Sequence, residues 1–196
     1  MAGRIVVLIS GSGSNMAALV GACRSGEVPG EVVAVGADRV CRGLVRAALE
    51  GVPTFVVRYD DHPSREQWSE TLRARVAAYA PDLVVCAGLM RILAPVFVDA
   101  YRGRLINLHP SLLPAFPGAH AVRDALHAGV KLTGTTIHLV DYEVDRGEIL
   151  HQASVPILGG DDEQRLHERI KSVEHRALPQ VCRSLLTRTP VAGSRP

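Results

Sequence analysis

The stretch RIVVLISGSGSN, residues 4 to 15, sets the expected architecture of this 196-residue chain. Residues 4–10 form a short, mostly apolar run, which predicts a buried strand. The Gly/Ser-rich residues that follow predict a turn, and a helix is expected to begin at about Asn15. A buried strand that leads through a turn into a helix is the first unit expected of a parallel sheet covered by helices.

The same rhythm continues through the first half of the chain. Further strands are predicted at residues 31–36, 54–59, 82–87 and 104–109. Between them, residues 63–80 have helical spacing, and the apolar residues expected on one helix face are Trp68, Leu72, Val76 and Tyr79. Strands that alternate with helices in this way predict a parallel sheet with helices on both faces.

The pattern changes after Gly134. TTIHLV (135–140) and EILHQASVPIL (148–158) are two strand patterns joined by a short turn region at 145–147, which predicts an antiparallel pair. A long helix is predicted at 162–186 from the spacing of Leu166, Ile170, Val173 and Leu178. We therefore expect one Rossmann-like α/β domain over residues 1–186, with a mostly parallel sheet and an antiparallel pair near its end. Residues 187–196 are predicted to be a flexible tail.

Composition excludes several classes of function. Hydrophobic residues make up 47% of the chain, charged residues 21%, and the net charge is +2, which is typical of a soluble globular protein. No run of lysine or arginine indicates nucleic-acid binding, and no segment is long enough to cross a membrane. The four cysteines are Cys23, Cys41, Cys86 and Cys182. They lie far apart in sequence and form no CxxC pair, which favours reduced thiols in a cytoplasmic protein.

The segment SGSGSN (10–15) lies between the first predicted strand and helix, where backbone N–H groups can bind an anion. Gly11 and Gly13 match two glycines of a dinucleotide-binding fingerprint, but Met16 occupies the position of the third. A phosphate monoester is therefore favoured over a dinucleotide. A simple tight turn without a ligand is the alternative.

The segment INLHPSLLPAFPG (106–118) interrupts a predicted strand with two polar residues. Alternation places Asn107 and His109 on one face, at the carboxyl end of a strand, where open α/β sheets bind their ligands. Three prolines then restrict the following loop, which suits a preorganised site. We interpret this segment as a candidate catalytic element.

Two further groups of charged residues leave alternatives open. HLVDYEVDRGEI (138–149) contains four acids, of which one beside His109 would form an acid–base pair, but spacing does not select which. A solvated acidic turn is the simpler interpretation. Lys171 and Glu174 stand three apart on the last predicted helix, and a surface ion pair is the simplest explanation for them. No histidine spacing indicates a metal site.

In their order along nearly the whole chain, these motifs resemble the phosphoribosylglycinamide formyltransferase family, folate-dependent enzymes of purine synthesis. The resemblance rests on IVVLISGSGSN, AGLMRIL (87–93), NLHPSLLPAFPG, GTTIH (134–138) and the acidic loop that ends at Asp145. It implies a largely parallel seven-stranded sheet. It also implies transfer of a formyl group from 10-formyltetrahydrofolate to the amine of glycinamide ribonucleotide, without a metal.

The resemblance also implies roles for individual residues. The catalytic group would be Asn107, His109 and Asp145. The ribonucleotide site would contain Gly13, Ser14, Asn15, Lys171 and Glu174. The folate site would contain Met90, Arg91, Ile92, Leu93, Asp141 and Asp145, with Arg65 near the cofactor tail.

The expected chemistry has Asn107 and a protonated His109 stabilising the oxygen that gains negative charge, while Asp145 raises the pKa of the histidine. Two positions depart from the family pattern. Arg146 replaces the usual glycine after the aspartate, and Val122 replaces a second histidine after the PG pair.

Three other functions are less favoured. A formyltetrahydrofolate hydrolase shares the Asn-His-Asp group but has a regulatory domain before the first strand, for which this sequence leaves no room. A methionyl-tRNA formyltransferase has a further tRNA-binding domain after the last helix. A non-enzymatic phosphate sensor would leave Asn107 and His109 without a role. We expect small-molecule substrates only, and a homodimer is left open.

Overall fold

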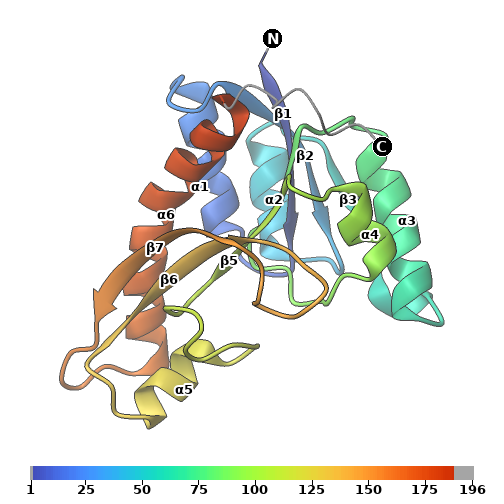
Figure 1. Ribbon diagram of the computed structural model, residues 1–196. Coiled ribbons are helices and arrows are strands. Elements are labelled where there is room, and N and C mark those ends of the chain that lie inside the picture. Colours follow the sequence, from blue (N-terminus) through green and yellow to red (C-terminus); the bar gives the residue numbers. More distant parts are fainter. Residues whose placement is uncertain (1, 188–196) are drawn as a thin grey trace.

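Strand β1 (Gly3–Ile9) lies inside a seven-stranded sheet whose strand order is β3-β2-β1-β4-β5-β6-β7 (Figure 1). The computed structural model describes residues 2–187. Strands β1 to β5 are parallel, while β6 and β7 run antiparallel to their neighbours, which confirms the predicted sheet. The other strands are β2 (Gly30–Ala37), β3 (Thr54–Val56), β4 (Leu83–Cys86), β5 (Leu105–His109), β6 (Leu132–Leu139) and β7 (Ile149–Pro156).

Successive side chains of β1 enter two different cores. Ile5, Val7 and Ile9 pack with helices α1 (Ser14–Arg24), α2 (Arg42–Leu49) and α6 (Glu163–Thr187) on one face. Val6 and Leu8 pack on the other face with α3 (Arg65–Ala77) and α4 (Pro95–Ala100). Because both faces are covered, the strand is apolar throughout and buried, as predicted. Helix α5 (Ala121–His127) contributes to a smaller cluster with β7 and α6.

The predicted strand at 54–59 is shorter than expected. Strand β3 ends at Val56, and the chain turns through a short 3-10 helix, η1 (Tyr59–Asp61). The carbonyl of Val57 accepts a hydrogen bond of 2.9 Å from the buried indole of Trp68, which ties the chain to α3 just after the strand ends. The predicted helix at 63–80 also included Tyr79, which was wrong. Tyr79 lies beyond the end of α3 and stacks on Phe55 with 5.7 Å between ring centroids.

The last helix matches its predicted extent closely. Asp162 accepts a hydrogen bond from the backbone N–H of Arg165 at 2.8 Å, which stabilises the helix start. Thr187, predicted as the first residue of the tail, is instead the final residue of α6, and residues 188–196 lie outside the described part of the chain. Within residues 2–187, no helix has the length and apolar character needed to cross a membrane.

The strand order places a ligand crevice beside β1 and β4. From β1 the chain continues to β2 and β3 on one side, and the next strand, β4, pairs with β1 on its other side. The connections that leave β1 and β4 therefore diverge at their carboxyl ends. Open α/β sheets bind ligands at such a switch point.

Candidate active site

A cavity of about 640 Å³ opens at the carboxyl ends of β1, β4 and β5. Its wall is formed by the connections that follow these strands, by the 138–145 segment and by one side of α6. Every candidate site residue named from the sequence lines this cavity except Arg65. Arg65 begins α3 and contacts the carboxylate of Glu66 at 3.1 Å, so its proposed role near a cofactor tail stays a prediction.

The Gly/Ser-rich loop enters the cavity through a left-handed turn. Gly13 has φ of 70°, and a Cβ atom there would lie 2.8 Å from the Cα of Gly43, so both conformation and packing require glycine. Gly13 is also the N-cap of α1, and no side chain caps this helix start. The first N–H groups of α1 are therefore available to bind an anion that enters the cavity.

Glu174 does not form the surface ion pair that was the simplest explanation of its spacing. Its residue surface is only 4% exposed, and it accepts hydrogen bonds from Asn15 Nδ2 at 2.7 Å and Thr135 Oγ1 at 3.1 Å. Burial raises the pKa of this carboxyl group, because the charged form loses contact with water. Lys171 lines the same cavity, as Glu174 does.

Sequence reasoning missed His167 as part of this wall. It precedes Lys171 by four residues on α6, so the two side chains share a helix face. Burial, followed by the charge of Lys171, lowers the pKa of His167. The i, i+4 spacing was the available signal, although it could not show which face of the helix borders a ligand site.

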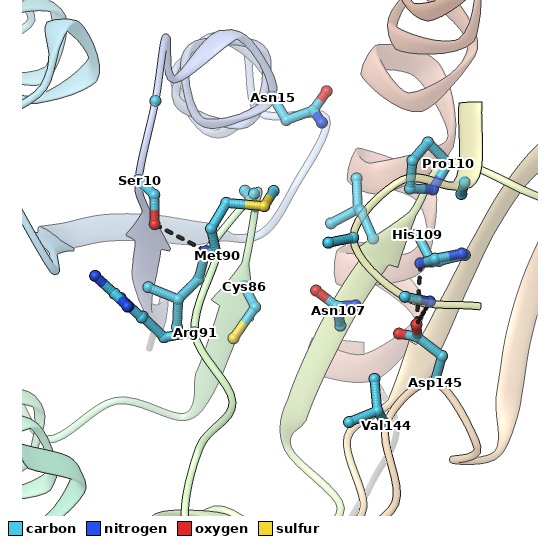
Figure 2. A pocket seen from close by; sticks show the side chains of 18 of the residues that line it. Ser10, Asn15, Cys86, Met90, Arg91, Asn107, His109, Pro110, Val144 and Asp145 are labelled. Atoms are coloured by element: carbon cyan, nitrogen blue, oxygen red, sulfur yellow. Dashed lines mark hydrogen bonds and ion pairs between the residues drawn. The ribbon is translucent and has the colours of Figure 1, made fainter. Parts of the chain in front are cut away.

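Asn107 and His109 project from β5 into the cavity region, and Asp145 approaches from the loop after β6 (Figure 2). His109 Nδ1 lies 3.3 Å from Asp145 Oδ2. His109 Nε2 lies 2.8 Å from the carbonyl oxygen of Phe116, which can only accept, so Nε2 carries a hydrogen. Of the four acids in the 138–149 segment, the structure brings Asp145 next to the histidine. The backbone N–H of Gly118 also donates a hydrogen bond to Asp145 Oδ2 at 2.8 Å.

Burial acts against the expected protonation of His109. It lowers the pKa of His109 and is the largest influence, while the Phe116 carbonyl and the negative charge of Asp145 act in the opposite direction. Asp145 thus acts as the sequence led us to expect, but its attraction is outweighed. The pKa of His109 therefore lies below that of a free imidazole, whereas both ring nitrogens face acceptor oxygens, which is the geometry of the protonated ring that the sequence led us to expect. Burial raises the pKa of Asp145, but its contacts with His138, Gly118 and His109 lower it overall, so the carboxylate is ionised.

His138 joins the catalytic candidates and was not singled out from the sequence. It lies on β6 directly opposite Asn107 in the antiparallel register. Its Nδ1 donates to the Leu139 carbonyl at 2.8 Å, so in the neutral ring Nε2 accepts from Asn107 Nδ2 at 3.3 Å. Asp145 Oδ1 lies 3.6 Å from the same Nε2. His138 therefore orients the amide of Asn107, and only the strand register reveals this.

The proline-rich loop is braced by the antiparallel strands. Thr136 Oγ1 donates to the Ser111 carbonyl at 2.7 Å and accepts from the Leu113 N–H at 3.0 Å. Gln152 donates to the Leu113 carbonyl at 2.8 Å. This loop carries the carbonyl of Phe116 and the N–H of Gly118, which contact His109 and Asp145. Its support therefore fixes the geometry of the pair.

The two departures from the family pattern have structural explanations. Val122 is 4% exposed and packs in an apolar cluster with Val155, Leu166 and Ile170. Arg146 is exposed. The loop packs tightly against the backbone of Leu139 one residue later, at Gly147. A Cβ atom on Gly147 would clash with the Leu139 carbonyl oxygen, so this loop requires glycine at 147.

The opposite wall of the cavity is apolar. Met90 and Ile92 are 62% and 52% exposed and line the cavity, so they present apolar surface to a ligand. The N–H of Met90 donates to Ser10 Oγ at 2.8 Å, which ties this wall to the carboxyl end of β1. Among the described residues, no group of three or more His, Cys, Asp or Glu side chains is arranged to hold a metal ion.

The family profile of formyl transferases matches residues 3–182. The phosphoribosylglycinamide formyltransferase of Mycobacterium tuberculosis (strain CDC 1551 / Oshkosh) is 54% identical over 184 residues, which are 94% of this chain and 85% of that protein. The chain therefore belongs to the formyl transferase family.

A solved structure supports a narrower placement. The crystal structure of glycinamide ribonucleotide transformylase 1 from Symbiobacterium toebii superposes with a TM-score of 0.90 at 46% identity, over 92% of this chain and 86% of that one. The trifunctional purine biosynthetic protein adenosine-3 of Drosophila pseudoobscura pseudoobscura is 47% identical over 180 residues, 90% of this chain but 13% of that protein. Within its family, the chain is one of the phosphoribosylglycinamide formyltransferases.

Proposed function

We propose that this enzyme transfers the formyl group of 10-formyltetrahydrofolate to the amine of glycinamide ribonucleotide in de novo purine synthesis. The observation that carries the proposal is a single cavity that contains a helix start suited to phosphate, an apolar wall and the Asn107, His109 and Asp145 group. Formylglycinamide ribonucleotide and tetrahydrofolate are the products.

The ribonucleotide half lies between α1 and α6. The N–H groups at the start of α1 and the ammonium group of Lys171 supply hydrogen bonds and positive charge for the phosphate. Glu174 offers a buried carboxylate to hydroxyl or amine donors of the same substrate. Gly13, Ser14 and Asn15 form the phosphate loop in this assignment.

The folate half lies against the 90–93 segment and the 141–145 loop. Met90 and Ile92 present apolar surface to the flat pterin ring, and Asp141 and Asp145 face it with carboxylate acceptors. Arg65 is assigned to the outer end of the cofactor, outside the cavity wall. No metal takes part, since the formyl group is already activated by its bond to the folate nitrogen.

The catalytic group acts on one proton and one developing charge. The amine nitrogen bonds to the formyl carbon, the bond from that carbon to N10 breaks, and one proton passes overall from the amine to N10. Asn107 donates its second amide N–H to the carbonyl oxygen as that oxygen gains negative charge. In its neutral form His109 accepts the amine proton, and the imidazolium formed is stabilised by Asp145 until the proton is passed to N10.

This proton transfer requires a change of hydrogen bonds at His109. Both ring nitrogens contact protein atoms, Nε2 the Phe116 carbonyl and Nδ1 the Asp145 carboxylate. A substrate group must therefore replace one of these contacts, directly or through a water molecule.

Formyl transfer measured with and without glycinamide ribonucleotide tests the proposal. Release of tetrahydrofolate that depends on the ribonucleotide is the expected result. Equal release without it would replace the proposal with the hydrolase function. We also propose that the enzyme is cytoplasmic and that its partners are small molecules, without nucleic acid. Whether it forms a homodimer is left open.

A further inference from the structure

The connection after β2 contains a buried carboxylate that the mechanism does not use. Asp38 is 3% exposed and does not belong to the cavity wall. Two arginines contact the same oxygen, Oδ2: Arg39 Nη2 at 2.7 Å and Arg91 Nε at 2.9 Å. Burial raises the pKa of Asp38, but hydrogen bonds from these arginines contribute to lowering it overall, so the carboxylate is charged.

Arg91 is held on a second side by an aromatic ring. Its guanidinium lies 4.1 Å from the ring centroid of Tyr59, a cation–π contact, and its Nη2 is 3.9 Å from Asp60 Oδ1. Figure 2 shows the Arg91 side chain directed away from Asn107 and His109. The positive charge of Arg91 is therefore directed toward protein groups rather than toward the catalytic residues.

Arg91 lies between the two exposed apolar residues of the cavity wall. Met90 and Ile92 flank it in sequence and are 62% and 52% exposed, whereas the Arg91 side chain is 27% exposed. The backbone here is fixed by one further bond, from the Met90 N–H to Ser10 Oγ. A side chain anchored beneath the segment thus determines how its two neighbours are presented to a ligand.

We propose that Asp38 is a positioning residue for the folate half of the site and acts through Arg91. This inference rests on the proposed function, since it assigns the 90–92 wall to the folate. The buried carboxylate holds the Arg91 side chain beneath the wall, and Met90 and Ile92 then remain in the orientation that receives the pterin. Without this charge, the arginine keeps only its contacts with Tyr59 and Asp60, and the wall is held less firmly in its shape.

Asp38→Asn tests the inference because it keeps the side-chain shape and removes the charge. The KM for 10-formyltetrahydrofolate is expected to rise about tenfold, as for loss of one charge-assisted hydrogen bond. The KM for glycinamide ribonucleotide and kcat should stay within about twofold, because their residues lie on other elements. Arg91→Gln should give the same selective defect. The double variant should be no worse than either single variant, since both remove one interaction.

Arg39→Gln is the matched control. Arg39 contacts the same oxygen of Asp38 but does not line the cavity, so its loss should leave the folate KM unchanged. An unchanged folate KM in Asp38→Asn, an equal rise in both KM values, or an equal defect in Arg39→Gln would each overturn the inference. If the wild-type enzyme does not formylate the ribonucleotide, the proposed function fails. Calorimetric binding of tetrahydrofolate to the same variants then still decides whether Asp38 positions the wall.

Discussion

Replacing Glu174 by glutamine should make the protein more stable at neutral pH. The carboxylate is buried with one neutral donor on each oxygen, the amide of Asn15 and the hydroxyl of Thr135. Among the described residues, no lysine, arginine or histidine forms a salt bridge with it, and Lys171 acts only through its longer-range charge. Glutamine keeps the shape and can accept from Asn15 while it donates to the Thr135 hydroxyl.

The magnitude follows from two opposing effects. Loss of the charge weakens each of the two hydrogen bonds by about 1 kcal/mol. Loss of the desolvation penalty of a buried ion gains several kcal/mol. The net stabilisation is therefore about 1 to 2 kcal/mol, which raises Tm by roughly 4 °C in a domain of this size. Ribonucleotide binding should weaken at the same time, because the charge serves the ligand rather than the fold.

The pH dependence supplies the sharper test. Because burial raises the pKa of Glu174 above 4.5, the cost of its charge is absent below pH 4.5, grows as pH rises from 4.5 to the folded-state pKa, and is constant above that pKa. Urea unfolding of wild type and Glu174→Gln from pH 4 to pH 8 should therefore show a stability difference that grows with pH. Glu168→Gln, an exposed position on α6, is the control and should show no such trend. A variant less stable at pH 8, or a difference independent of pH, would refute the reasoning.

Three further substitutions test the catalytic, folate and ribonucleotide assignments. Asp145→Asn should lower turnover by about 10² to 10⁴, as for loss of acid–base assistance, with little change in the dissociation constant of the ribonucleotide and a much smaller effect on that of the folate than on turnover. Its pH profile should also move to lower pH, because loss of the neighbouring charge lowers the pKa of His109 further. Asp141→Asn should affect folate binding more than turnover, and near-normal turnover in Asp145→Asn would contradict the catalytic group. Lys171→Ala should weaken ribonucleotide binding more than folate binding, and equal effects on both dissociation constants would count against its assignment to the phosphate.

The local pattern of apolar and polar residues was sufficient to predict most of the fold. The apolar run of β1 predicts a strand buried on both faces, and the observed cores on its two sides confirm this. The pattern failed at 57–59, where valine and tyrosine suggest a strand. A side chain from α3 takes the Val57 carbonyl there, and no local sequence signal records that contact.

The candidate site depended more strongly on distant contacts. Spacing placed Asn107 and His109 together but could not choose among four acids, because the choice depends on how the loop after β6 returns to β5. Spacing alone suggested a surface ion pair between Glu174 and Lys171, and only the resemblance to the family assigned them to the ribonucleotide site. Its burial depends on α1 and β6, which are far from it in sequence. Register and helix docking are tertiary facts that no single segment specifies.

The bond between Asn15 and Glu174 joins residues 159 positions apart, and this separation has a consequence for synthesis of the chain. A ribosome produces the β1–α1 unit early, but the partner of Asn15 emerges only when most of α6 has been made. Until then the amide of Asn15 lacks its acceptor, and the proposed ribonucleotide site is incomplete. A ligand stabilises only a state that binds it, so the ribonucleotide cannot assist the growing chain. Binding of the ribonucleotide can therefore protect the chain against proteolysis only after α6 has left the ribosome and docked.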